Sequence, residues 1–332
     1  MKKLLSISID RSIWSEGSAV RERMRELSKG WDEVHIIVAS DSTYTETVIG
    51  DNVWVYPTRS KVKAFYPIDA RKLGRFIIRR RGITQITCQD PFLTAIAGVG
   101  LKKEFGLPLE LQVHTDVGSP NYPYTIGNKI RKALALSYLP QADTIRVVSG
   151  RIRDYLVSRL GIDGSKITVR PIAVDVMKIK NAVVTVDLHR KYPQFDKIVL
   201  MASRLTAEKN ISLALTAWTE VQRNCPGAGL VIVGNGPKEK ALKSMAEKLG
   251  IGKSVAFEGW ADQGTLVSYY KTADLFLNTS LFEGYGMTLV EAKAAALRTV
   301  STDVGIAREI GATIVDMNAG SVALGIKAAL GV

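Results

Sequence analysis

Residues 281–292 read LFEGYGMTLVEA and lie between an expected β-strand and an expected helix. Gly284 and Gly286 let the backbone approach a ligand closely, and a helix start offers N–H groups and the positive end of its dipole to a phosphate. Glu283 and Glu291 are eight residues apart, so the first lies in the loop and the second about one turn into the helix. Both carboxylates could accept hydrogen bonds from sugar hydroxyls. A surface loop before a solvated helix would contain the same residues, so the spacing alone leaves both interpretations open.

Outward from this stretch, short runs rich in Val and Ile alternate with helical patterns along the whole chain. Such alternation is typical of parallel sheets that helices cover on both faces. Buried strands are expected at 4–9, 34–38, 53–56, 83–87, 109–113 and 144–148, and again at 198–202, 229–233, 255–257, 275–278, 299–301 and 313–315. Helices are expected at 19–29, 70–80, 92–103, 126–139, 151–160 and 290–297.

The break between the two series of strands predicts two domains. Residues 175–196 are polar, lack a clear period and end in turn chemistry. We therefore predict an α/β arrangement of two Rossmann-like parallel-sheet domains facing a central cleft, with an N-terminal domain at 1–178, a linker at 179–196 and a C-terminal domain at 197–332. Ligands of such sheets bind outside the carboxyl ends of the strands, so the loops that follow strands are the informative ones.

Composition excludes several classes of protein. The chain has 332 residues, of which 46% are hydrophobic, too many for a disordered chain. Two cysteines are too few for a disulfide framework, so a reducing, cytoplasmic setting is expected. No window holds 18 uninterrupted apolar residues, and the apolar run in MKKLLSISID is short and ends at an Asp. Neither a transmembrane helix nor a signal peptide is therefore expected.

The positive charge of the chain is unevenly distributed. The net charge is +13, and residues 1–180 contain 29 basic and 18 acidic residues, whereas residues 181–332 contain 16 and 14. A strongly basic half favours an anionic partner, which could be nucleic acid, a phosphorylated substrate or a membrane surface.

Three more clusters follow expected strands in the second half. Arg204 and Lys209 stand five residues apart at a strand end, where they could clamp a diphosphate, although two solvated cations would look the same. Gly234 begins a Gly-x-Gly turn, which alone is a weak signal. Trp260 follows a Phe-Glu-Gly run and could flank a nucleotide base or lie at the rim of the core.

Together and in this order, the four clusters resemble the second half of the retaining glycosyltransferases of family 4, which have the GT-B fold. The resemblance covers at least residues 198–310. The family's Glu-x7-Glu motif is matched by Glu283 and Glu291, its Glu-Gly-Phe/Tyr-Gly run by 283–286, and its Arg-Leu and Lys-Asn block by 204–210.

The resemblance implies a role for each matched residue. Glu291 would hold the ribose hydroxyls and Glu283 the transferred sugar. Arg204 and Lys209 would neutralise the diphosphate, and Trp260 would flank the base. The expected donor-binding set is Gly17, Arg204, Lys209, Gly234, Trp260, Glu283, Gly284, Tyr285, Gly286, Met287, Thr288 and Glu291.

The first half matches the family less fully. His114 stands at the end of an expected strand, where the family often has a histidine near the transferred sugar, although a lone histidine is more often structural. The expected catalytic residues are Glu283, His114, Arg204 and Lys209. The family's Gly-rich loop after the first strand is represented only by Gly17, and residues 89–92 look like its usual approach to a helix.

The implied activity is that of a retaining hexosyltransferase that moves a sugar from a nucleoside-diphosphate sugar to a hydroxyl of a glycan or a lipid-linked acceptor. Cations and helix N–H groups can stabilise the departing diphosphate without a metal. The sequence has no Asp-x-Asp motif and no His/Cys metal spacing, so neither a metal nor a cofactor is expected.

The basic residues of the first half predict an acceptor or membrane surface. In the segment 70–80, Ala70, Leu73, Phe76 and Ile77 form one helical face and the cations lie largely outside it, as in an interfacial helix; residues 126–139 are a second candidate. An ordinary amphipathic helix with a solvated basic face has the same pattern. The expected surface consists of Lys61, Lys63, Arg71, Lys72, Arg75, Arg79, Arg80 and Arg81, and would place a cytoplasmic protein peripherally at the inner face of the membrane.

Other functions stay open at this point. A nucleotide-sugar epimerase or a sugar phosphorylase would share the same fold, and the single Gly17 leaves room for a non-catalytic sugar-nucleotide-binding subunit. Nucleic-acid binding is disfavoured because aromatic residues make up only 7% of the chain. A dehydrogenase is disfavoured because the Gly-x-Gly turn lies mid-chain without the complete dinucleotide fingerprint.

Overall fold

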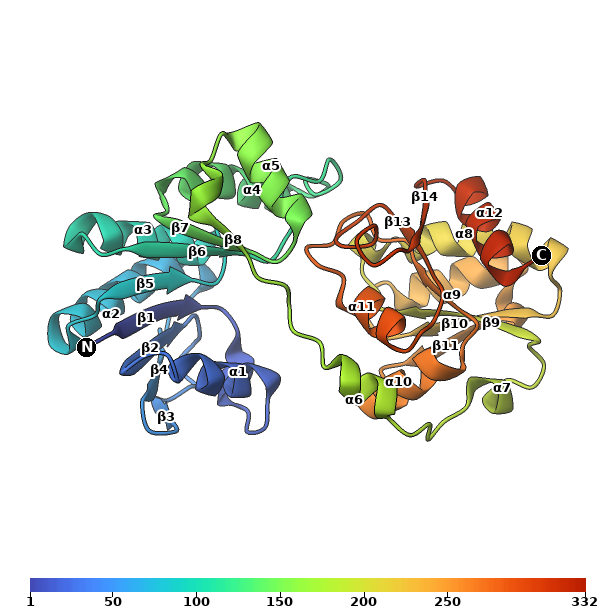
Figure 1. Ribbon diagram of the computed structural model, residues 1–332, viewed down its shortest axis with the longest axis horizontal. Coiled ribbons are helices and arrows are strands. Elements are labelled where there is room, and N and C mark those ends of the chain that lie inside the picture. The colour runs from blue at the N-terminus through green and yellow to red at the C-terminus, as the bar shows by residue number, and fades with distance from the viewer. The chain divides into compact units, whose positions relative to one another are not determined.

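The computed structural model describes residues 1–332 and divides into two compact units, Met1–Arg170 (unit 1) and Pro171–Val332 (unit 2). Each unit is a sheet flanked by helices (Figure 1). The predicted α/β fold with two parallel-sheet domains is confirmed. The N-terminal domain predicted at 1–178 extends a few residues past the observed division.

Unit 1 contains an eight-stranded sheet in the order β3-β4-β2-β1-β5-β6-β7-β8. Neighbouring strands are parallel except β3 and β4, which form an antiparallel pair at one edge. The six strands predicted for this half are present. The structure adds β3 and β8, which have three residues each and were not predicted. The strands are β1 (Lys3–Ser8), β2 (Glu33–Val38), β3 (Thr47–Ile49), β4 (Val53–Pro57), β5 (Gln85–Cys88), β6 (Leu109–Val113), β7 (Thr144–Val147) and β8 (Ile167–Val169).

Local sequence signals set the ends of the helices of unit 1. Ser18, Thr125 and Ser149 precede α1, α4 and α5, and each accepts a hydrogen bond from a backbone N–H of the first turn. Glycines in the left-handed conformation end α2, α3 and α5. The helices are α1 (Ala19–Ser28), α2 (Tyr66–Arg81), α3 (Leu93–Phe105), α4 (Ile126–Tyr138) and α5 (Gly150–Leu160), with short 3-10 turns η1 (Arg11–Trp14), η2 (Lys63–Phe65), η3 (Leu139–Gln141) and η4 (Gly164–Lys166).

Unit 2 contains a six-stranded parallel sheet in the order β11-β10-β9-β12-β13-β14. All six strands predicted for this half are present. Trp218 belongs to one of the core clusters of this unit, is fully buried and donates a hydrogen bond from Nε1 to Ser254 Oγ at 3.1 Å. The strands are β9 (Lys197–Ala202), β10 (Ala228–Val233), β11 (Val255–Gly259), β12 (Leu275–Asn278), β13 (Thr299–Thr302) and β14 (Thr313–Val315). The helices are α8 (Ile211–Asn224), α9 (Glu239–Lys248), α10 (Gln263–Thr272), α11 (Met287–Ala294) and α12 (Ala319–Leu330), with turns η5 (Ala207–Lys209) and η6 (Gly252–Ser254).

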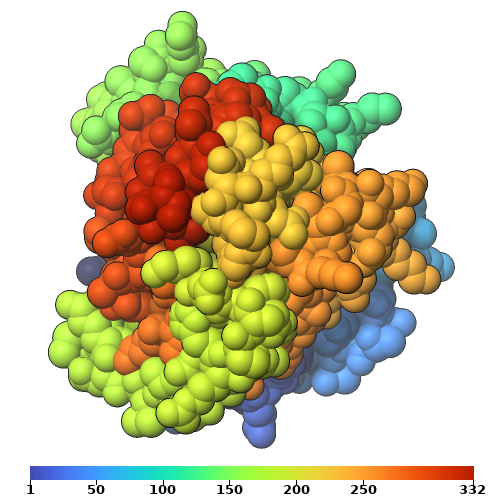
Figure 2. Space-filling view, turned by 90° about the vertical axis from the view of Figure 1, so that its right-hand side faces the viewer, coloured from blue at the N-terminus to red at the C-terminus, as the bar shows by residue number.

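The segment predicted as a free linker, 179–196, instead belongs to unit 2. It includes the last three residues of α6 (Val176–Asn181) and all of α7 (Leu188–Lys191). Ile179 is buried in a small core cluster of unit 2, and Lys191 Nζ lies 2.5 Å from Glu258 Oε2 on β11. Figure 2 shows this segment, in yellow-green, lying against the rest of the unit. The prediction was wrong because single apolar residues in a polar stretch can anchor short helices without producing a period.

The helix that follows the loop at 281–286 begins three residues earlier than predicted and ends at Ala294. Gly286 precedes it with φ of 96°, a left-handed conformation that glycine adopts at little cost. The turn imposed by this glycine, rather than the apolar period, therefore sets the start of α11. No helix of either unit has the length and apolar character that crossing a membrane requires.

Candidate active site

The order of strands in unit 2 creates a switch point between β9 and β12. The chain runs from β9 through β10 to β11 on one side, and through β12 and β13 to β14 on the other. The loops after β9 and β12 therefore leave the sheet side by side and turn to opposite sides, which is where open α/β sheets bind ligands. These loops contain residues 203–210 and 279–286, the two segments with the strongest sequence signals.

An ion pair joins the two loops. Lys209 Nζ lies 2.5 Å from Glu283 Oε1, and each side chain is only 16% exposed. Backbone contacts hold the loops in this position, since Leu281 N–H donates to the Glu208 carbonyl at 2.8 Å. The structure thus brings together two predicted catalytic residues that are 74 positions apart in the chain.

A buried polar network supports Glu283 from behind. Ser280 Oγ lies 2.8 Å from both Glu283 Oε1 and Asn278 Oδ1, and its single proton can be donated to either. Asn278 Nδ2 donates to Ser301 Oγ at 3.0 Å, and Thr302 Oγ1 donates to the Ser280 carbonyl at 2.7 Å. All four supporting residues are buried, and a satisfied buried network favours one conformation. The sequence analysis missed them, although polar residues ending the apolar strands β12 and β13 were a usable signal.

Glu291, the other carboxylate of the motif, lies on α11 and is 8% exposed. Tyr270 donates its hydroxyl proton to Glu291 Oε2 at 3.0 Å, and Gln263 Nε2 lies 3.5 Å from Oε1. Burial raises the pKa of Glu291, and the two hydrogen bonds oppose part of that rise. Tyr270 and Gln263 were also missed by sequence analysis, because the partner of a buried carboxylate cannot be identified from one chain without its tertiary contacts.

Glycines let the loops of this edge pack backbone against backbone. Gly234 has φ of 126°, and a Cβ there would lie 1.9 Å from the Ser203 carbonyl oxygen. A Cβ on Gly305 would lie 2.3 Å from the Tyr285 carbonyl oxygen. The predicted Gly234 is therefore required by contact with a neighbouring loop, a reason that holds whether or not a ligand approaches it.

The remaining predicted donor residues are more exposed or belong to the helix start. The Arg204 side chain is 74% exposed, with a guanidinium nitrogen 3.2 Å from Glu208 Oε1, and Trp260 is 71% exposed just after β11. No side chain caps α11, so the N–H groups of Met287 and Thr288 lie at its open positive end. Gly284 and Tyr285 lie in the loop that leads to this end.

Unit 1 holds the other two predicted site residues. His114 follows β6, with Nε2 3.3 Å from Gln112 Oε1. Although the residue as a whole is exposed, its ring is crowded, and desolvation followed by repulsion from Arg146 and Arg23 lowers its pKa to about 4. The imidazole is therefore neutral at physiological pH. Gly17, just before α1, has φ of 71° and nothing near its would-be Cβ.

The apolar face predicted for α2 is buried at Ala70 and Ile77 but not at Phe76. Ala70, Gly74, Ile77 and Ile78 are buried, whereas Phe76 is 51% exposed. A Cβ on Gly74 would lie 2.5 Å from Leu101 Cδ1 of α3. Because the two helices approach each other at this glycine, α2 is rotated so that Phe76 faces outward. The basic side chains on α2 are Arg71, Lys72, Arg75, Arg79, Arg80 and Arg81, and Lys61 and Lys63 precede it.

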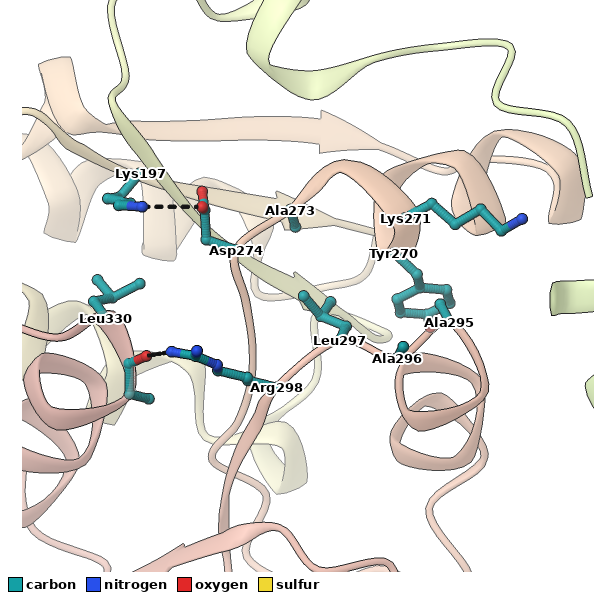
Figure 3. Close-up of a pocket in the computed structure, with 11 residues that line it drawn as sticks. Lys197, Tyr270, Lys271, Ala273, Asp274, Ala295, Ala296, Leu297, Arg298 and Leu330 are labelled. Atoms are coloured by element: carbon teal, nitrogen blue, oxygen red, sulfur yellow. Dashed lines mark hydrogen bonds and ion pairs between the residues drawn. The ribbon is translucent and has the colours of Figure 1, made fainter.

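A cavity of about 330 Å³ lies at the opposite end of the strands of unit 2 (Figure 3). Lys197, Asp274 and Arg298 line it close to the amino ends of β9, β12 and β13. Arg298 donates to the Ala329 carbonyl at 2.8 Å, and Lys197 pairs with Asp274. Its cations are thus occupied, and it is separate from the edge with Glu283. Tyr270 connects the two regions, since its ring lines this cavity and its hydroxyl bonds Glu291.

Comparison with known families agrees with this geometry. The model of the glycosyl transferases group 1 matches residues 188–316, and the model of glycosyltransferase family 4 matches residues 17–178. Together the two matches cover most of the chain, mainly one in each unit.

Curated relatives point the same way. The alpha-monoglucosyldiacylglycerol synthase of Streptococcus pneumoniae is 28% identical over 226 residues, which is 65% of this chain and 51% of that protein. A phosphatidylinositol N-acetylglucosaminyltransferase subunit of Arabidopsis thaliana is 30% identical over 243 residues, 71% of this chain and 51% of that protein. The chain spans about half the length of these two relatives.

Solved structures with the same fold cover nearly the whole chain. Sucrose-phosphate synthase from Thermosynechococcus elongatus has a TM-score of 0.81 at 17% identity and covers 100% of this chain and 90% of that one. An Anabaena protein solved with UDP and glucose has a TM-score of 0.73 at 16% identity and covers 99% and 89%. The family matches, the relatives and the shared fold thus agree that the chain belongs to the family 4 glycosyltransferases, with the GT-B fold.

Proposed function

We propose that this protein is a retaining, metal-independent glycosyltransferase that moves a sugar from a nucleoside-diphosphate sugar to a hydroxyl of a glycan or lipid-linked acceptor. The observation that carries the proposal is the Lys209–Glu283 ion pair, held at the switch point of unit 2 by two loops and a buried network. A pair of opposite charges fits a donor with an anionic diphosphate beside a sugar rich in hydroxyls.

The donor would lie along the switch-point edge. Lys209, the exposed Arg204 and the open positive end of α11 would face the diphosphate. Glu291 would accept from the ribose hydroxyls. Each of its oxygens has one protein donor, and a carboxylate oxygen can accept two hydrogen bonds, so acceptor capacity remains. Glu283 would hold the transferred sugar, and Trp260 would flank the base.

The proposed reaction exchanges one bond at the anomeric carbon for another. The bond to the diphosphate oxygen breaks, and the acceptor oxygen bonds the same carbon on the same face. The proton of the acceptor hydroxyl passes to the departing phosphate. Lys209, Arg204 and the N–H groups of α11 would stabilise the negative charge of the leaving group, and preorganised charges of this kind are commonly the largest catalytic contribution.

His114 would serve this reaction as a neutral group. Because its pKa is about 4, its imidazole would hydrogen-bond the transferred sugar without adding a positive charge near the anomeric carbon. The proposed reaction needs no metal, because Lys209 and Arg204 of unit 2 would neutralise the diphosphate. EDTA should leave turnover unchanged, and a loss of turnover that magnesium restores would contradict this part.

The acceptor is proposed to be presented at a membrane surface. Phe65, Ile68 and Phe76 are each about half exposed and lie with Lys72 along the outer side of η2 and α2. On α4, Ile126 and Ile130 are exposed beside Lys129, and residues 117–142 contain no acidic side chain. Lys72 has one acidic neighbour, Asp69, at 3.9 Å. Apolar residues among cations suit an anionic lipid surface. Two relatives bear names that refer to glycosylation of lipids.

A donor panel tests the activity. The full chain is incubated with UDP, GDP and ADP sugars and with glycan or lipid acceptors, and NMR of the product reports the anomeric configuration. Turnover with retention is expected with one donor. Glu283→Gln should lower kcat about 10²–10³-fold, whereas Glu239→Gln, a partly exposed carboxylate on α9, should not. Donor binding without transfer to any acceptor would favour the non-catalytic binding subunit.

Vesicle co-sedimentation tests the membrane surface. Retention should be greater on anionic than on neutral vesicles, and Phe65→Ser/Ile68→Ser should reduce it. Leu324→Ser, which removes an exposed apolar residue of unit 2, is the matched control. Equal recovery of the wild type with neutral and anionic vesicles would contradict the membrane proposal and leave the donor reaction untouched.

A further inference from the structure

A cavity in unit 1 lies apart from every residue assigned above to the donor. It has a volume of about 250 Å³ and is formed by β3, β4 and the last turns of α2. Its walls include Val48, Trp54, Tyr56, Phe76, Arg80 and Arg81. Small-molecule sites commonly have about 300–1,000 Å³, so this volume suits a compact group rather than a whole nucleotide.

The arginines of α2 divide into two sets with different partners. Arg71, Arg75 and Arg79 all approach Glu104, at 3.2, 2.7 and 4.0 Å. Arg80 and Arg81 form no ion pair, and Arg81 hydrogen-bonds the Tyr56 hydroxyl. Their guanidinium carbons lie 4.4 Å from the centre of the Phe76 ring and 5.3 Å from that of the Trp54 ring.

Stacking on an aromatic ring leaves the N–H donors of a guanidinium available at its edges. Glu46 is the one carboxylate among the lining residues, and it is exposed. Two guanidiniums outweigh this carboxylate and the partial negative charge at the end of α2, which is about half a charge. The cavity therefore has a net positive charge.

The floor of the cavity is rigid. His35 is fully buried and stacks on Trp54, with ring centres 4.9 Å apart. Its Nδ1 lies 3.1 Å from the Tyr56 hydroxyl and its Nε2 2.9 Å from Glu33 Oε2. Burial lowers the pKa of His35, so its ring adds no charge at neutral pH, and the Glu33 carboxylate beside it is paired with Lys3 at 2.6 Å. Because these contacts fix the Trp54 and Tyr56 rings, they also fix the surface on which Arg81 rests.

We propose that this cavity binds a phosphate ester, and that the ester is the headgroup phosphate of a membrane lipid. Arg80, together with the N–H donors that Arg81 does not give to Tyr56, matches the oxygens of a phosphate, which arginine commonly binds through paired N–H donors. Val48 and Phe76, both about half exposed at the rim, would contact the apolar part of a lipid. The choice of a lipid rests on the membrane-facing role proposed above for α2, whereas the phosphate site rests on the cavity itself.

The test compares two double variants of the full chain on the same vesicles. Arg80→Ala/Arg81→Ala removes the two cavity cations. Arg75→Ala/Arg79→Ala removes the same charge from the same helix outside the cavity. Binding is measured on phosphatidylcholine vesicles with and without phosphatidic acid, whose headgroup is a phosphate monoester. The cavity variant should weaken binding to the phosphatidic acid vesicles at least tenfold more than the control variant.

Further arms separate the sources of the phosphate and protect against misfolding. Arg80→Lys/Arg81→Lys keeps the charge and should bind at an intermediate level. If glycerol 3-phosphate raises the Tm of the wild type but not of the cavity variant, while vesicle binding is equal in both, the ligand is a soluble ester and the lipid assignment is overturned. Equal losses in the two alanine variants would overturn the site itself.

The donor site is reported separately by the rise in Tm with a nucleotide sugar. Absence of that rise in the wild type would contradict the proposed transferase and not this cavity. If a nucleotide sugar raises the Tm of the wild type but all variants bind vesicles equally, the cavity proposal is contradicted and the transferase proposal is not.

Discussion

Units 1 and 2 have the same kind of sheet and the same kind of switch point, yet the loops at the two points carry different chemistry. In unit 2 the switch point lies between β9 and β12 and holds the Lys209–Glu283 ion pair. In unit 1 it lies between β1 and β5, where Ser8 Oγ donates to Gln89 Oε1 at 2.7 Å. The fold thus supplies two equivalent edges, and the side chains decide what each can bind.

The two units also differ in net charge, and unit 1 has the larger positive charge. Residues 1–170 contain 27 basic and 17 acidic side chains, whereas residues 171–332 contain 18 and 15. Unit 2 concentrates a few charges at one edge, and unit 1 spreads many over its surface, eight of its 27 basic residues lying on α2 and just before it. A specific anion site needs a few fixed cations, whereas attraction to a charged surface depends on the number of cations.

The largest effect is expected from breaking the ion pair of unit 2. Lys209→Met should lower kcat about 10²–10³-fold, because it removes a preorganised positive charge that stabilises the leaving group. Gln89→Ala, at the corresponding edge of unit 1, should change kcat far less. Steady-state kinetics with the best donor of the panel measures both. Equal losses in the two variants would mean that the two edges do not differ in function as proposed.

The two glycine loops should differ next in their effect on stability. Gly234→Ala adds a Cβ against the Ser203 carbonyl oxygen in a backbone conformation that only glycine adopts easily, and should destabilise unit 2 by about 3 kcal/mol. Gly17→Ala meets no neighbour and should cost only the left-handed conformation, about 1 kcal/mol. Urea unfolding measures both. A larger loss at Gly17 would show that loop contacts of unit 1 outweigh those of unit 2.

A smaller effect is expected from Tyr270→Phe, which removes a hydrogen bond to a buried carboxylate. The KM for the donor should rise about tenfold, with a smaller change in kcat, because Tyr270 orients Glu291 and does not itself contact the donor. The pKa of Glu291 should rise further when this donor is lost. The lower-pH limb of kcat/KM against pH should therefore move to higher pH. A fall in kcat with unchanged KM would place Tyr270 in a different role.

The smallest effect concerns His114 in unit 1. Its pKa of about 4 in the folded protein is below its ordinary value near 6.5, so the unfolded chain binds the proton more readily. The stability contributed by the neutral ring is complete above about 6.5 and is lost as pH falls through about 4. The wild type should therefore lose Tm relative to His114→Gln over that range. If the difference in Tm between the wild type and His114→Gln stays constant from pH 7 to pH 4, the pKa of His114 is not lowered by folding.

The sequence predicted much of the fold because its signals are local. Apolar runs and helix patterns identified all the strands longer than three residues, and the loops with Glu283 and Lys209 were recognised from motifs. The place of Phe76 on α2 was predicted wrongly, since the contact of Gly74 with Leu101 on α3 rotates Phe76 outward. The linker was also predicted wrongly, because Ile179 and Leu188 find their partners only in unit 2.

The sequence by itself determined the order of strands and helices, the family, the charge difference between the halves and the candidate residues of the donor loop. Only the tertiary structure decided that Lys209 meets Glu283, that Tyr270 supports Glu291, and that Arg80 and Arg81 rest on aromatic rings while their neighbours share Glu104. The physical reason is how far apart in the chain the interacting residues are. Turns, caps and periodicity depend on residues a few positions apart, whereas charge pairing and burial depend on residues that the sheet brings together from distant parts of the chain.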